Sequence, residues 1–68
     1  MNPEELAKIF TYHAPKNGQI EKYEIIRKQA LEFAQILNKL CPDSPDKVIA
    51  IAKIREAVMW ANSSIALE

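Results

Sequence analysis

The sequence has only one cysteine, one histidine and one glycine among its 68 residues. A single cysteine excludes an intramolecular disulfide, and no Cys/His cluster shows the spacing of a structural metal site. No apolar run approaches the roughly 18 residues of a membrane-spanning helix, and the N-terminus lacks a signal-peptide pattern. We therefore predict a cytoplasmic protein that needs no metal or cofactor and does not enter a membrane.

The sequence also lacks an excess of charge of either sign, because nine basic residues balance nine acidic ones. Proteins that hold DNA or RNA polymers through the phosphate backbone need an extended basic face. The balance argues against such partners. It leaves room for a small basic site that binds a small anion.

The length allows one small domain, residues 1–68. Below roughly 70–80 residues one hydrophobic core rarely supplies enough stability, so such folds need disulfides, a metal or self-association. The first two are not indicated, and 49% of the residues are apolar. We therefore predict a compact homo-oligomer.

Helix start signals occur at two places in the chain. Asn2 can cap a helix that has Pro3 at its first position, which predicts a short helix over about 3–9. Ser44 and Pro45 repeat this arrangement and predict a long helix over about 45–66.

The third helix has one main stripe of residues at 3/4 spacing, with Arg55 and Asn62 as polar interruptions. The stripe contains Val48, Ile51, Ala52, Arg55, Val58, Met59, Asn62 and Ile65. Ile49, Ile54, Trp60 and Ala61 are expected on other faces of this helix.

Between these two helices, apolar residues at 3/4 spacing predict another long helix over about 20–40. Pro15 and Asn17-Gly18 place a loop before it, and Pro42 ends it. The short connection makes the two long helices antiparallel neighbours. The predicted fold is all-α, a short helix followed by a two-helix antiparallel hairpin.

The segment around Trp60 is apolar on nearly every side. Val58, Met59 and Trp60 are consecutive and point in three directions, since successive residues of a helix are about 100° apart. One partner helix cannot cover all three. We predict that Met59 and Trp60 lie in a core or subunit interface. Asn62, a polar residue on this apolar helix, is expected to form an intersubunit hydrogen bond or a ligand contact.

The sequence gives little support for catalysis. His13 and Cys41 are separated by a predicted helix, and no carboxylate pair at a suitable spacing is evident. Cys41 ends an apolar stripe and is expected to be a small buried hydrophobe. We predict that the protein is not an enzyme.

Ligand binding has better candidates, in the predicted loop and at the start of the second helix. Tyr12, His13 and Lys16 place an aromatic ring and cations close together, which suits a flat anionic ligand. Arg27 and Lys28 could reach toward the loop if it folds along the helix. Alternatively, Tyr12 packs the loop on the hairpin and the two cations form a solvated flank.

Two segments of the sequence form a spaced pattern. The first is Phe10–Lys16 (FTYHAPK), continued by Gly18-Gln19, Lys22-Tyr23 and Ile26-Arg27. The second is Leu40–Ser44 (LCPDS), continued by Lys53, Glu56–Asn62 (EAVMWAN) and Ile65-Ala66. Together they resemble a known family, the small phage anti-CBASS proteins that sequester cyclic oligonucleotides.

The resemblance implies helical hairpins that assemble as homohexamers in the host bacterial cytoplasm. Such proteins bind cyclic di- and trinucleotides, for example 3′,3′-cGAMP, without cleaving them. They thereby evade CBASS anti-phage defence. A related hairpin occurs in phage sponges for the cyclic ADP-ribose signals of Thoeris, which is the competing ligand class. A second alternative, open from the sequence, is a helical protein–protein interaction module.

The resemblance also implies site residues. The family's stacking tyrosine falls on Tyr12, and its phosphate-contacting lysine falls on Lys28, with Arg27 as the neighbouring candidate. Gln29 lies near a position that lines the same pocket. Ala52 and Leu67 stand where relatives tend to place a hydroxyl and a basic residue, which suggests a restriction to dinucleotides.

Overall fold

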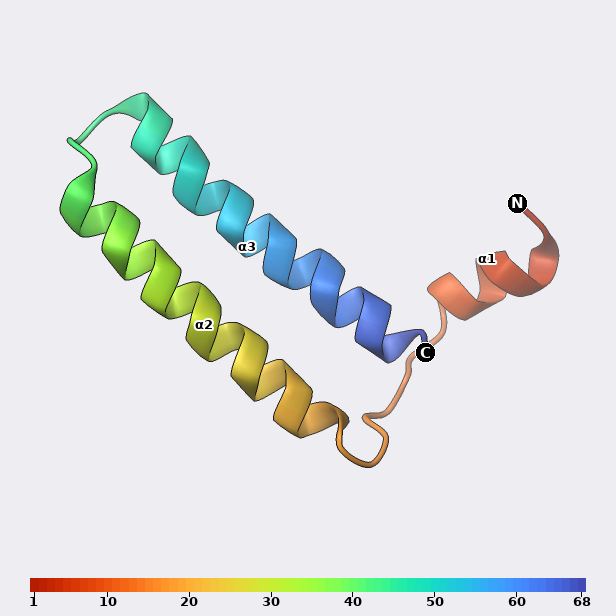
Figure 1. The fold of residues 1–68 in the computed structure, drawn as a ribbon. Helices are drawn as coiled ribbons and strands as arrows, with labels where there is room; N and C mark the ends of the chain where they lie inside the picture. The colour runs from red at the N-terminus through yellow and green to blue at the C-terminus, as the bar shows by residue number, and fades with distance from the viewer.

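A computed structural model describes residues 1–68 as three α-helices without any β-strand (Figure 1). The helices are α1 (Pro3–Ile9), α2 (Gln19–Leu40) and α3 (Pro45–Ala66). The all-α prediction is confirmed. The second helix begins at Gln19, one residue before the expected position, because Gly18 adopts a left-handed conformation with φ 83° and ends the turn there.

The short helix α1 forms where its cap predicts. Asn2 Oδ1 accepts a hydrogen bond from the Glu5 backbone nitrogen at 2.8 Å, and Pro3 occupies the first turn. This helix packs on neither α2 nor α3 within the chain. Figure 1 shows it beyond the end of the hairpin where α2 begins and α3 ends. A loop over residues 10–18 connects it to α2.

The two long helices form an antiparallel hairpin (Figure 1). At the connecting turn, Ser44 Oγ accepts from the Lys47 backbone nitrogen at 3.2 Å and donates to the Pro42 carbonyl at 3.2 Å. The Lys47 ammonium pairs with Asp43 at 2.9 Å. The polar groups exposed by the end of one helix and the start of the next are thus satisfied locally.

The seam between α2 and α3 is made of small and branched apolar residues, all half-buried. On α2 they are Ile26, Ala30, Ala34 and Leu37; on α3 they are Ala50, Ile51, Ile54, Val58 and Ala61. Ile54 and Ala61 were expected on other faces of α3. Val48 and Met59, expected in the main stripe, are 68% and 69% exposed. The expected stripe of α3 was right for Ile51 and Val58 and wrong for Val48 and Met59, because a helix that is apolar on nearly every side has no single preferred face.

The hairpin is one helix layer thick, and the Cα atoms of the entire chain span 46 × 28 × 12 Å. In a single layer, each helix covers only the side of its neighbour that faces the seam. The two broad faces of the hairpin therefore keep exposed apolar side chains, among them Ile25, Leu31, Phe33, Ile36 and Trp60. No hydrophobic residue of the single chain is fully buried. Large apolar patches of this kind mark surfaces that bind a partner.

Candidate functional site

The loop before α2 is tied back to α1. Thr11 Oγ1 donates to the Ala7 carbonyl at 2.5 Å, and His13 Nε2 donates to the Lys8 carbonyl at 2.6 Å. The contact of His13 places a proton on Nε2, since a carbonyl oxygen can only accept. Tyr12 makes no hydrogen bond and is 84% exposed. The loop therefore presents the tyrosine ring to solvent, and His13 acts as a structural link.

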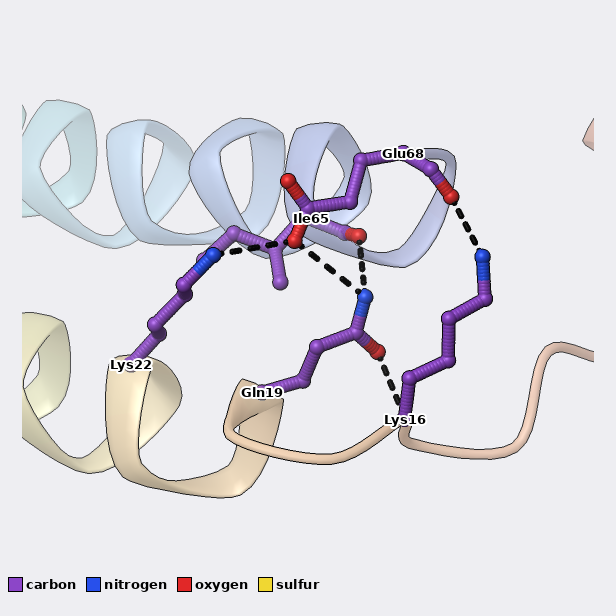
Figure 2. A network of polar contacts seen from close by, with 5 residues as sticks. All are labelled: Lys16, Gln19, Lys22, Ile65 and Glu68. Carbon is purple, nitrogen blue, oxygen red and sulfur yellow. Dashed lines mark hydrogen bonds and ion pairs between the residues drawn. The ribbon is translucent and has the colours of Figure 1, made fainter.

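The end of the loop is held by a polar network that we call the Gln19 clasp (Figure 2). Gln19 Nε2 donates to the Ile65 carbonyl at 2.9 Å, and Gln19 Oε1 accepts from the Lys16 backbone nitrogen at 2.8 Å. The Glu68 carboxylate pairs with the Lys22 ammonium at 3.0 Å. The Lys16 ammonium donates to the Glu68 backbone oxygen at 2.6 Å. The clasp joins the loop, the start of α2 and the end of α3.

The Gln19 clasp lowers the pKa of one carboxyl group, that of Glu68. Hydrogen bonds from Lys22 and Gln19, followed by the positive charge of Lys22, hold the pKa of the Glu68 carboxyl below its ordinary value. Lys16, expected to meet a ligand, uses its ammonium in this clasp. Gln19 was not among the expected site residues. Its signal in the sequence was an amide immediately after the Asn17-Gly18 turn, three residues beyond Lys16.

Arg27, Lys28 and Gln29 face three different ways, as consecutive residues of a helix must. Arg27 lines an open groove of about 380 Å³ on one face of the hairpin, which we call the Arg27 groove. Gln29 lines a larger groove of about 610 Å³ on another side, which contains Phe33 and which we call the Phe33 groove. Lys28 is exposed and lines neither groove. The structure thus separates the three candidate residues.

The residues expected at an interface also separate. Met59 lines the Arg27 groove, and Trp60 is 69% exposed and lines neither groove. Asn62 lies near the seam with its Oδ1 buried and without a hydrogen-bond partner. An intrachain core position for Trp60 is therefore not seen. Its burial requires contact with another molecule.

One chain brings Arg27 and Met59 to one groove, and Lys16 to the clasp, but it does not join Tyr12 to Lys28. Tyr12 lies on the loop that leads away toward α1. This loop does not fold along α2, which was the condition for Arg27 and Lys28 to reach it (Figure 1). No group of three or more His, Cys, Asp or Glu residues is arranged to hold a metal ion. The arrangement offers an exposed aromatic ring, cations and apolar grooves.

The chain matches the model of a known protein family. The model of the Acb2/Tad1 hairpin domain matches residues 2–66, nearly the entire chain. The chain belongs to this family. It is the family of anti-CBASS and anti-Thoeris sponges, phage proteins that bind signalling molecules, as the resemblance implied. No curated protein and no solved structure matched the chain. None of its helices combines the length and the apolar character needed to cross a bilayer.

Proposed function

We propose that this protein binds and sequesters cyclic oligonucleotide messengers, with cyclic dinucleotides such as 3′,3′-cGAMP as the main ligands. It releases them chemically unchanged, and sequestration in the cytoplasm of the bacterial host blocks CBASS defence. The observation that carries the proposal is the family match over residues 2–66. The exposed ring of Tyr12 supports it, since stacking on an aromatic ring is a general way to hold a base.

The separation of Tyr12 and Lys28 within one chain supports our proposal that the site is made by two copies. A cyclic dinucleotide has two bases and two phosphates related by true or approximate two-fold symmetry. A two-fold interface presents each side chain twice, so each chain needs to supply only half a site. The uncovered apolar faces of the hairpin supply the surface for such self-association, and we propose a homohexamer.

Sequestration without cleavage is part of the proposal. Hydrolysis of a phosphodiester needs a positioned acid/base pair or a metal ion. The one histidine, His13, uses its Nε2–H in a hydrogen bond to the Lys8 carbonyl of its own chain. Binding through stacking and charge-assisted hydrogen bonds needs neither acid/base pair nor metal.

Cyclic ADP-ribose is the second candidate ligand class, because the family model covers Tad1 as well as Acb2. It too carries phosphates and a flat base. The same exposed ring and cations suit both ligand classes, so the choice between them depends on direct comparison.

The decisive experiment is isothermal titration of the purified protein with 3′,3′-cGAMP and with cyclic ADP-ribose, followed by heat denaturation and chromatography of the ligand. We expect saturable binding of 3′,3′-cGAMP, near one ligand per two chains, and full recovery of intact ligand. Degraded ligand would contradict sequestration. Binding of cyclic ADP-ribose alone would assign the protein to Thoeris. Binding of neither, with a stable complex formed with a host protein, would favour an interaction module.

A further inference from the structure

Two arginines from different helices line the same groove. Arg27 of α2 and Arg55 of α3 both border the Arg27 groove, whose apolar wall includes Leu31, Ile51 and Met59. Sequence reasoning treated Arg55 only as a polar interruption of an apolar stripe. The structure places it opposite one of the candidate phosphate-binding residues.

The register of the hairpin brings these two arginines to nearly the same level. The hydrogen bond from Gln19 to Ile65 fixes which residues of α2 and α3 face each other. Eight residues further along α2 lies Arg27, and eight residues back along α3 lies Ala57, two residues from Arg55. At about 1.5 Å per residue, the two arginines differ by only about 3 Å along the hairpin. Packed helices lie about 8–10 Å apart, a separation that two long side chains can bridge through one anion.

Neither guanidinium has a partner within the chain. The three ion pairs of the protein all use lysines, namely Lys22, Lys47 and Lys53. No carboxylate lines the Arg27 groove. The Phe33 groove differs in this respect, since its one cation, Lys53, is paired with Glu56 at 3.2 Å. Uncompensated positive charge above an apolar wall is therefore found at the Arg27 groove.

This combination selects the chemistry of a ligand. Guanidinium groups bind phosphate oxygens through two parallel hydrogen bonds, and two guanidiniums without an acid between them repel until an anion separates them. An apolar wall with a thioether, here Met59, suits the flat face of a base. The groove thus fits a molecule that joins phosphate to a base, and it excludes a purely apolar partner from its charged edge.

We infer that Arg55 is a second phosphate-binding residue, which acts with Arg27 across the groove on a cyclic nucleotide whose ring contains phosphate groups. The inference rests on the proposed function and adds to it a residue on α3. Cyclic dinucleotides and cyclic ADP-ribose share the required chemistry, so both are used as probes. The competing interpretation is that both arginines are only solvated flanks of their helices.

The test compares Arg55→Gln and Arg27→Gln with Lys39→Gln, which removes an exposed, unpaired cation from α2 away from both grooves. Each protein is titrated with 3′,3′-cGAMP and with cyclic ADP-ribose at several salt concentrations. We expect Arg55→Gln to weaken binding of the cognate ligand about 10- to 100-fold and to reduce its salt dependence, while Lys39→Gln has no effect beyond about twofold. Arg55→Lys keeps the charge without the planar fork and should lose less.

A double variant decides whether the two arginines share one ligand. If they do, the loss in Arg27→Gln/Arg55→Gln should differ from the product of the two single losses. Circular dichroism and mass in solution identify any variant that misfolds, and Arg55→Lys then serves as the measured variant. Wild-type affinity and salt dependence in the Arg55 variants, with binding intact in the unmodified protein, would overturn this inference alone. Failure of the unmodified protein to bind either probe would overturn the proposed function as well.

Discussion

The side-chain amide of Gln19 donates to the backbone carbonyl of Ile65 at 2.9 Å, and this contact closes the open end of the hairpin. Gln19 is 3% exposed and is the one buried residue of the chain. Its other amide atom accepts from the backbone of Lys16. The residue that begins α2 thus fixes both the end of α3 and the end of the loop that carries Tyr12.

Removal of this amide should loosen the loop. Gln19→Ala deletes three hydrogen bonds, of which the one to Glu68 Oε1 is long at 3.4 Å. The two shorter ones are each worth about 0.5–1.5 kcal/mol net, so we expect a loss of about 1–3 kcal/mol in the free energy of unfolding. In hydrogen exchange, the Lys16 amide should exchange faster, because its acceptor is gone. Gln35→Ala removes an exposed glutamine of the same helix that makes no side-chain hydrogen bond, and serves as the control. Equal melting and equal Lys16 exchange in both variants would contradict a positioning role for Gln19.

The cap at the other end of the hairpin gives a second prediction. Ser44 Oγ accepts from the Lys47 backbone at the first turn of α3. Loss of such a cap costs about 0.5–2 kcal/mol. For a chain of this size each kcal/mol shifts the melting temperature by about 4–8 °C. Thermal melts of Ser44→Ala should show this decrease. Ser64→Ala, at an exposed serine without a hydrogen bond, should melt within about 2 °C of wild type on the same scale.

Acid should weaken the turn through Asp43. A hydrogen bond from Lys47, and then its positive charge, hold the pKa of the Asp43 carboxyl below its ordinary value of 3.8. The unfolded chain therefore binds a proton at Asp43 more readily than the folded chain. The stabilising contribution is present above about pH 4 and is lost as the pH falls through the lowered folded value.

Melting temperatures measured from pH 7 to pH 2.5 test this contribution. Asp43→Asn should melt below wild type at pH 7, and the difference should shrink as the pH falls below about 4. Lys47→Gln removes the cation that lowers the pKa, so it should flatten the same part of the curve. A difference between wild type and Asp43→Asn that stays constant over the entire range would show that the pair contributes no pH dependence.

The sequence was sufficient for the helices because their limits depend on local signals. Asn2, Ser44 and the prolines that follow them mark helix starts, and Asn17-Gly18 and Pro42 mark turns. The rotation of α3 was not predictable in the same way. Apolar residues surround α3, so spacing alone could not decide that Ile54 lies in the seam and that Met59 does not.

The site was predictable only in part. The candidate roles of Tyr12 and Lys28 came from a resemblance to the family. The match over residues 2–66 shows that the chain belongs to this family, and it carries no information on either residue. The role of Gln19 was not predicted, because its partner Ile65 is 46 residues away. The amide after the Asn17-Gly18 turn marks a polar residue in the sequence but does not identify its partner. Arg27 and Lys28 are adjacent, and only the rotation of α2 shows that Arg27 borders a groove.

Trp60 should report self-association. Its ring is 69% exposed in one chain, so burial depends on another copy. We expect Trp60→Ala to dissociate or unfold the proposed assembly, since truncating a buried tryptophan costs about 3–5 kcal/mol. Light scattering measures the mass, and the emission of this single tryptophan reports its exposure in wild type. Trp60→Phe keeps most of the apolar surface and should retain more of the assembly. Unchanged mass in Trp60→Ala would remove Trp60 from the interface.

Tyr12 should affect binding without affecting folding. It lies outside the helices and is 84% exposed, so Tyr12→Ala should change the free energy of unfolding by less than about 0.5 kcal/mol. Loss of one stacked base costs about 1–3 kcal/mol, so affinity for 3′,3′-cGAMP should fall about 5- to 150-fold. Tyr12→Phe keeps the ring and should bind nearly as wild type if stacking is the main contribution. An equal loss in Tyr12→Phe and Tyr12→Ala would instead assign the contact to the hydroxyl. Wild-type affinity in Tyr12→Ala would mean that the loop has no part in the site, and the grooves on α2 and α3 would then have to supply the entire binding surface.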